Sequence, residues 1–247
     1  MRNPLLAAAV ALALLGMTTL GPVLRPYFLQ TPLADVRASV SFALYAVDLL
    51  LIVGVILAFG GRERPSLAKL AGLSAPITGP ALLAVLVFAP AAAIAALNAP
   101  VSRDFDAFDI ATGGVLYPLF EEIGFRGLAL GALMRLCGWR FLPAALLPAA
   151  FFGAAHFWQG QGPAEIAGVV AITAFGGLVF GWLFVRWRYN LWPPFFLHAG
   201  LNTLWTVFAL GETALGGWLG NALRFGVVAA ALLLTLLMTK RPADATV

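Results

Sequence analysis

Residues 79–97 read GPALLAVLVFAPAAAIAAL, a stretch of 19 residues without a charged side chain. About 20 apolar residues in a helix cross the ~30 Å hydrocarbon layer of a bilayer, so this stretch predicts a transmembrane helix. Further runs of similar apolarity are bounded by Pro, Gly or charged residues. The predicted spans are, roughly, 4–24, 39–60, 79–97, 111–134, 141–158, 165–185, 191–210 and 217–238. The sequence therefore predicts an all-α polytopic membrane protein, a bundle of about eight transmembrane helices.

The composition excludes the other broad classes of protein. Of the 247 residues, 62% are hydrophobic and 11% are charged, with a mean hydropathy of +0.94. This excess rules out a water-soluble globule, and also a membrane β-barrel, whose strands alternate apolar and polar residues. The connections between the runs are short, so we expect a single membrane domain over residues 1–247. The 15 basic residues are scattered, so no nucleic-acid partner is expected.

Lys and Arg side chains set the expected orientation. When the connections are assigned alternately to the two sides of the membrane, ten basic residues fall on the side of the termini and three on the other. The ten are Arg2, Arg62, Arg64, Lys69, Arg135, Arg140, Arg186, Arg188, Lys240 and Arg241. Because positive residues concentrate on the cytoplasmic side, both termini are predicted to be cytoplasmic. We expect an integral protein of a bacterial inner (plasma) membrane, surrounded by the lipid bilayer.

The fourth predicted span contains three ionisable side chains near its middle, in the segment YPLFEEIGFR at 117–126. A charge at a helix centre costs roughly 2.5 to 3.5 kcal/mol on insertion, so these groups need partners. Glu122 and Arg126 are four residues apart, on one helix face, and can form an ion pair of purely structural purpose. Glu121 points about 100° away and has no basic residue at helical spacing. We predict that Glu121 contacts another helix or water.

The two histidines of the chain also fall within apolar spans, the fifth and the seventh. Phe152 and His156 share one helix face, as do His198 and Asn202. A lone intramembrane histidine is usually a hydrogen-bonding residue between helices, but here three spans carry such groups. Counted from the helix ends, Glu121, His198 and Asn202 lie at similar depth and His156 lies near the outer mouth. The sequence predicts that these residues line one cavity, open to the outer half, that could activate water for hydrolysis.

The ordered motifs resemble one known family. They are Glu121-Glu122-x-x-x-Arg126, Phe152-x-x-x-His156 and His198-x-x-x-Asn202. In this order, on the fourth, fifth and seventh spans, they are similar to the CAAX protease and bacteriocin-processing enzyme family of intramembrane proteases. The motif-bearing core covers about 111–210. The resemblance implies an intramembrane endopeptidase.

The resemblance also implies roles for the residues. Glu121 would activate water together with His156, and His198 with Asn202 would stabilise the tetrahedral oxyanion. The ion pair on the helix of Glu121 would order the site. Relatives have been discussed as metal-dependent, and two histidines with a glutamate suit zinc. Because each histidine is alone on its helix, without a His-Glu-x-x-His spacing, we expect a glutamic-type enzyme without a cofactor.

The substrate implied by the resemblance is a protein or peptide with a membrane-embedded or lipidated C-terminal segment. An outward-facing cavity favours cleavage near the C-terminal end or membrane anchor of an exported protein. The alternative is a CAAX-type prenyl-protein endopeptidase at the cytoplasmic face. A second alternative is a proton- or ion-coupled transporter that uses the buried Glu and His groups, although no inverted repeat is visible. A membrane scaffold without activity is a third.

Overall fold

The computed structural model describes residues 3–211 and 215–239, and every regular element within them is helical. The elements are α1 (Pro4–Phe28), η1 (Pro32–Asp35), α2 (Ser39–Phe59), α3 (Leu67–Ala71), α4 (Thr78–Asn98), α5 (Ala107–Asp109), η2 (Ile110–Leu116), α6 (Tyr117–Glu121), η3 (Glu122–Leu130), α7 (Gly131–Arg135), α8 (Phe141–Ala154), η4 (Phe157–Gln159), α9 (Pro163–Arg186), α10 (Trp192–Val207) and α11 (Trp218–Met238). The predicted all-α architecture is confirmed.

Helices stand at each of the predicted spans. Within the described residues, 6 helices are long and apolar enough to cross a membrane: α1, α2, α4, α9, α11 and the segment Phe141–Gln159 that includes α8. The other two predicted spans are the continuous helix from Ala107 to Arg135 and the 16-residue α10, and both carry motif residues. α10 stops at Val207 because the chain then becomes extended, where Phe208 pairs with Val101. The protein is thus a polytopic all-α membrane protein.

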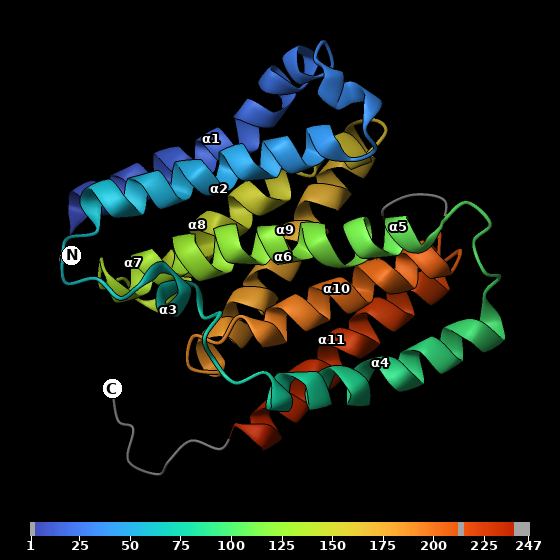
Figure 1. Cartoon of the computed structure of the whole chain (residues 1–247). Helices are drawn as coiled ribbons and strands as arrows, with labels where there is room; N and C mark the ends of the chain where they lie inside the picture. Colours follow the sequence, from blue (N-terminus) through green and yellow to red (C-terminus); the bar gives the residue numbers. More distant parts are fainter. Residues whose placement is uncertain (1–2, 212–214, 240–247) are drawn as a thin grey trace.

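Successive long helices run in opposite directions. The alternate assignment of the connections to the two sides of the membrane requires this arrangement. Figure 1 shows α1 beginning, and α11 ending, toward the side of the bundle where α3 and α7 also lie. Side chains join the connections at this end: Arg135 donates to the carbonyl of Lys69, and Arg186 donates to the carbonyl of Thr239. The described members of the basic set therefore gather at one end of the bundle. Three members, at positions 2, 240 and 241, lie outside the described residues.

One continuous helix at the centre of the bundle carries Glu121, Glu122 and Arg126. It runs through α5, η2, α6, η3 and α7, with α2 packed on one side and α10 on the other (Figure 1). Two stretches, Ile110–Leu116 and Glu122–Leu130, have the wider π-helical hydrogen bonding. Such turns are rare and are frequent at functional sites. The second π-helical stretch begins at Glu122 itself.

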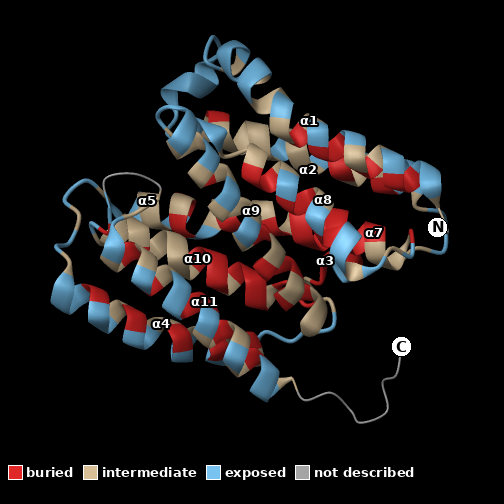
Figure 2. Cartoon of the chain, turned by 180° about the vertical axis from the view of Figure 1, so that it is seen from behind, coloured by how far each residue is buried: buried red, intermediate tan, exposed pale blue. Residues whose placement is uncertain are grey.

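The surface of the bundle is apolar, as a lipid-embedded protein requires. Figure 2 shows that buried residues lie on the inward faces of the helices and exposed residues on the outward faces. The exposed residues include large aliphatic ones such as Leu50, Leu97 and Leu237. Lipid tails are as apolar as these side chains, so their exposure costs nothing in a bilayer. The buried charged groups of the described chain, Glu122 and Arg126, are in the central helix.

An exposed ion-pair clasp ties α2 to the central helix at the end away from the termini. The guanidinium of Arg37 donates to Asp106 over 2.6 Å and to Asp109 over 2.7 Å, and it also lies over the ring of Phe108. The hydrogen bond from Arg37 lowers the pKa of Asp106, so the clasp persists into mildly acidic solution. The clasp holds the start of α2 near the start of the central helix. The same two helices are in contact at Tyr45 and Glu121.

Glycines let the central helix approach α3, and α9 approach α8, closely. A Cβ atom at Gly127 would lie 2.8 Å from the backbone oxygen of Ala71, and one at Gly177 would lie 3.1 Å from Cα of Ala149. Small residues at such contacts allow backbones to pack directly against each other in membranes.

Because the atoms facing Gly127 are the backbone and Cβ of Ala71, they cannot move aside cheaply. We expect Gly127→Ala to lower the free energy of unfolding by about 1 to 3 kcal/mol through overpacking. Thermal unfolding of the purified protein in detergent measures this loss. The matched control is Gly176→Ala in α9, where a new Cβ meets nothing within 4 Å. Equal unfolding midpoints for the two variants would contradict the close approach at Gly127.

Candidate active site

A buried ion pair forms the floor of the site. Glu122 Oε1 lies 3.1 Å from Arg126 Nη1, and the exposed fractions of the two side chains are 0% and 3%. The predicted pairing at a spacing of four residues is confirmed. Removing two charges from water is costly, so this pair requires further partners. Arg126 Nη1 and Nη2 and Glu122 Oε2 have no hydrogen bond within the described chain.

Aromatic rings supply part of the stabilisation of the guanidinium. Cζ of Arg126 lies 4.1 Å from the ring centroid of Phe152 in α8 and 5.2 Å from that of Phe180 in α9. A desolvated cation over an aromatic face gains about 2 kcal/mol. The absence of a side chain at Gly177 makes room for Nη2, since a Cβ there would lie 3.2 Å from it. Three helices therefore hold Arg126 in one position.

His198 of α10 lies between the two glutamates. Its Nδ1 is 2.9 Å from Glu122 Oε1, and its Nε2 is 3.6 Å from Glu121 Oε2. An ionised carboxylate only accepts hydrogen bonds, so Nδ1–H of His198 donates to Glu122. The ring stacks on Phe180 at 5.1 Å, which fixes its plane.

Glu121 has partners on two other helices, as predicted from the lack of a basic neighbour on its own. Its Oε1 accepts a 2.7 Å hydrogen bond from the hydroxyl of Tyr45 in α2, and its Oε2 faces His198. The side chain of Glu121 is 15% exposed, whereas that of Glu122 is fully buried. Glu121 is therefore the carboxylate of the pair that a water molecule or a substrate can reach.

His156 follows the last turn of α8, at the mouth of the site. Its Nδ1 is 2.7 Å from the carbonyl oxygen of Phe152, so Nδ1 carries the proton and Nε2 of the neutral ring keeps a free lone pair. The ring of Phe152 lies 4.6 Å from that of His156 and 5.9 Å from that of His198. Within the described residues, no hydrogen bond or ion pair joins His156 directly to Glu121.

Asn202 lies one turn beyond His198 in α10, but its contact is with the central helix. Its Nδ2 donates a 3.1 Å hydrogen bond to the backbone oxygen of Gly113, in the first π-helical stretch. The amide has a second N–H, which can donate to another acceptor. The structure thus brings Glu121, Glu122 and His198 into direct contact and anchors Asn202 separately.

Two polar residues of α2, Tyr45 and Asp48, belong to the site and were not singled out from the sequence. Asp48 is half-buried and close enough to Glu121 for the charges of the two carboxylates to interact. Asp48 is an ionisable residue inside an apolar run, which is the signal that identified Glu121. Tyr45 is three residues earlier and shares a helix face with it.

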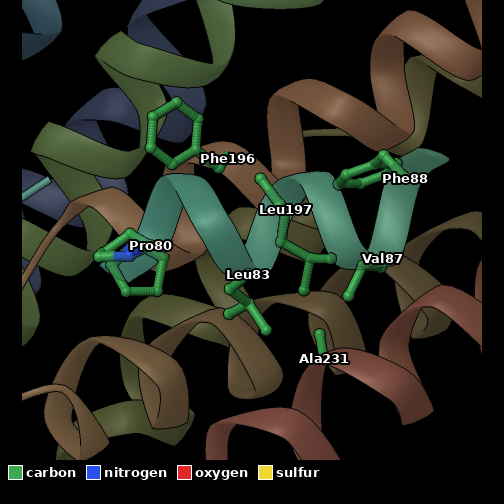
Figure 3. A pocket seen from close by; sticks show the side chains of 9 residues that line it. Pro80, Leu83, Val87, Phe88, Phe196, Leu197 and Ala231 are labelled. Carbon is green, nitrogen blue, oxygen red and sulfur yellow. The ribbon is translucent and has the colours of Figure 1, made fainter. Parts of the chain in front are cut away.

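An apolar pocket lies on the other side of α10. Figure 3 shows Leu83 and Phe88 of α4 and Leu197 of α10 around it, and every residue that lines it is apolar. Leu197 directly precedes His198 in the chain. The pocket therefore offers an apolar surface next to the residue that precedes His198. It contains no ionisable side chain.

The possible metal ligands do not form a metal site. Across residues 3–211 and 215–239, no group of three or more His, Cys, Asp or Glu side chains is arranged to hold a metal ion. Both ring nitrogens of His198 face carboxylate oxygens.

Comparison with known proteins finds a family match for the motif-bearing segment. Residues 103–204 match the family model described as type II CAAX prenyl endopeptidase Rce1-like. No curated protein and no solved structure matches the chain. The matched segment contains the complete set of motifs, from Glu121 to Asn202, and it favours a peptide hydrolase over a transporter. The match over residues 103–204 supports the CAAX protease and bacteriocin-processing enzyme family of intramembrane proteases.

Proposed function

We propose that the protein is a glutamic-type intramembrane endopeptidase. It hydrolyses a peptide bond near the C-terminal end or membrane anchor of a lipidated or membrane-embedded protein. The observation that carries this proposal is the difference between the two adjacent glutamates. Glu122 is buried against Arg126 and His198, while Glu121 stays accessible and takes a neutral hydroxyl group as its closest partner.

Glu121 is placed to act as the general base. A water molecule that donates to Glu121 Oε2 loses its proton to that oxygen as its own oxygen bonds to the scissile carbonyl carbon. The free lone pair of His156 Nε2 accepts the second hydrogen of the water and orients it. When the C–N bond breaks, the proton on Glu121 passes to the leaving amine nitrogen.

The developing oxyanion needs donors that are already in place. The second N–H of Asn202 is available for this purpose, and we assign His198 the neighbouring position. The hydrogen bond from Asn202 to Gly113 and the contact of His198 with Glu122 hold both side chains in position. Glu122 and Arg126 act as positioning residues, since they hold His198 and do not reach the substrate.

The position of the site favours a substrate on the non-cytoplasmic side. His156 follows the end of α8 that faces away from the termini, and Asn202 lies nearer the end of α10 than its start. With cytoplasmic termini, as the basic residues predict, this half of the bundle faces outward. A cysteine-accessibility map tests the orientation: a residue introduced near Gly160 should react with an impermeant reagent in intact cells. Reaction only after lysis would favour the cytoplasmic face.

The proposed activity is tested with purified protein in liposomes. A peptide carrying a prenylated C-terminal cysteine motif and the same peptide without the lipid are incubated with the protein, and the products are identified by mass spectrometry. We expect cleavage of the lipidated peptide, none by Glu121→Gln, and no effect of a chelator. Activity that is abolished by chelation and restored by zinc would contradict the glutamic mechanism.

A further inference from the structure

Tyr45 lies outside the segment that matches the family model, yet it makes the shortest contact with Glu121. Its hydroxyl donates to Glu121 Oε1 over 2.7 Å, from a helix 76 residues away in the chain. A hydrogen bond to a charged group is shorter and stronger than one between neutral groups. The contact is therefore specific for one oxygen of the accessible carboxylate.

The ring of Tyr45 is held in place by other aromatic side chains. It lies 5.1 Å from the ring of Tyr117 and 5.6 Å from that of Phe120, both in the central helix. Phe42, one turn earlier in α2, makes edge contacts with the same two rings at 5.7 and 6.1 Å. Phe42, Tyr45, Tyr117 and Phe120 thus form an aromatic cluster that fixes the hydroxyl group before any substrate binds.

The partner of Glu121 differs in kind from the partner of Glu122. Glu122 is paired with a guanidinium, which neutralises it, whereas the hydroxyl of Tyr45 carries no charge. A neutral donor can orient a carboxylate without cancelling its negative charge. Oε1 already accepts this bond, whereas Oε2 accepts no hydrogen bond within the described chain, so Oε2 has the larger free acceptor capacity for a water molecule.

We propose that Tyr45 is a positioning residue that selects Oε2 of Glu121 as the basic oxygen. This inference rests on the proposed function, in which Glu121 activates water. While Oε2 takes the proton from water and later returns it to the leaving amine, the Tyr45 hydroxyl keeps its own proton and stays bonded to Oε1. Substrate contacts are not involved, so the residue acts on the rate of the chemical step.

The test is Tyr45→Phe, which keeps the ring contacts and removes the hydroxyl. We expect kcat for the lipidated peptide to fall about 10- to 100-fold, the equivalent of one hydrogen bond to a charged group, with KM and the unfolding midpoint unchanged. The matched control is Tyr117→Phe, since the hydroxyl of Tyr117 makes no hydrogen bond within the described chain. This control should retain the kcat of the unmodified protein.

The outcomes separate this inference from the proposed function. An unchanged kcat, or a Tyr45→Phe protein that does not fold, overturns the role of Tyr45, provided that Glu121→Gln is inactive. If Glu121→Gln still cleaves, the proposed function itself fails. A fall in kcat that is equal for Tyr45→Phe and Tyr117→Phe also overturns the inference, because it would indicate general disturbance of the aromatic cluster.

Discussion

The Glu121→Gln substitution is expected to lower kcat by about 10⁴-fold, the upper end of what a positioned general base contributes. Glutamine has nearly the same shape, and its amide oxygen can still accept the hydrogen bond from Tyr45. It cannot take a proton from water. The substitution therefore removes the chemistry and leaves the packing of α2 against the central helix.

Single-turnover cleavage of the lipidated peptide in liposomes measures this effect. The unfolding midpoint in detergent checks that the variant protein is folded. The neighbouring Glu122→Gln is the comparison, since it should disturb His198 and Arg126 and lower stability as well as rate. Residual activity of Glu121→Gln above a tenth of the original would show that another group activates water.

The Arg126→Ala substitution is expected to destabilise the fold by about 3 to 5 kcal/mol, because it leaves a buried carboxylate without its cation. It also removes the cation from the rings of Phe152 and Phe180. The change acts on the interior of the protein, so it should appear as a lower unfolding temperature and a lower yield of monodisperse protein.

A compensating pair of substitutions separates charge from packing. In Arg126→Met with Glu122→Gln, an apolar chain of similar length faces a neutral amide, and much of the lost stability should return. Its activity should stay low, because His198 loses the ionised partner of Nδ1. If Arg126→Ala were as stable as the unmodified protein, the ion pair would not contribute to holding the central helix.

The sequence predicted the helices well because hydrophobicity and length decide which segments cross a bilayer. It did not predict the π-helical stretches, which contain Gly113 and Glu122, two residues that contact α10 through Asn202 and His198. It also extended the seventh span to 210, whereas the pairing of Phe208 with Val101 ends α10 earlier.

Within the site, contacts along one helix were predictable and contacts between helices were not. The pairing of Glu122 with Arg126 follows from a spacing of four residues and is present. Phe152 and His156 are also in contact, but α8 ends at Ala154, so His156 lies in the turn after the helix and not on the predicted helix face. The position of His198 between two carboxylates depends on how α10 packs against the central helix. The predicted catalytic roles of these residues stay predictions.

The local ion pair also has a consequence for how the protein is made. His198 follows Glu122 by 76 residues, so at about 5 to 20 residues per second the ribosome delivers the imidazole roughly 4 to 15 s after the carboxylate. During that interval Glu122 already has Arg126 on its own helix, which lowers the cost of transfer from the translocon into lipid. In the proposed mechanism, His198 and Asn202 join the site only when the seventh span has inserted, so we expect the nascent chain to be inactive until then.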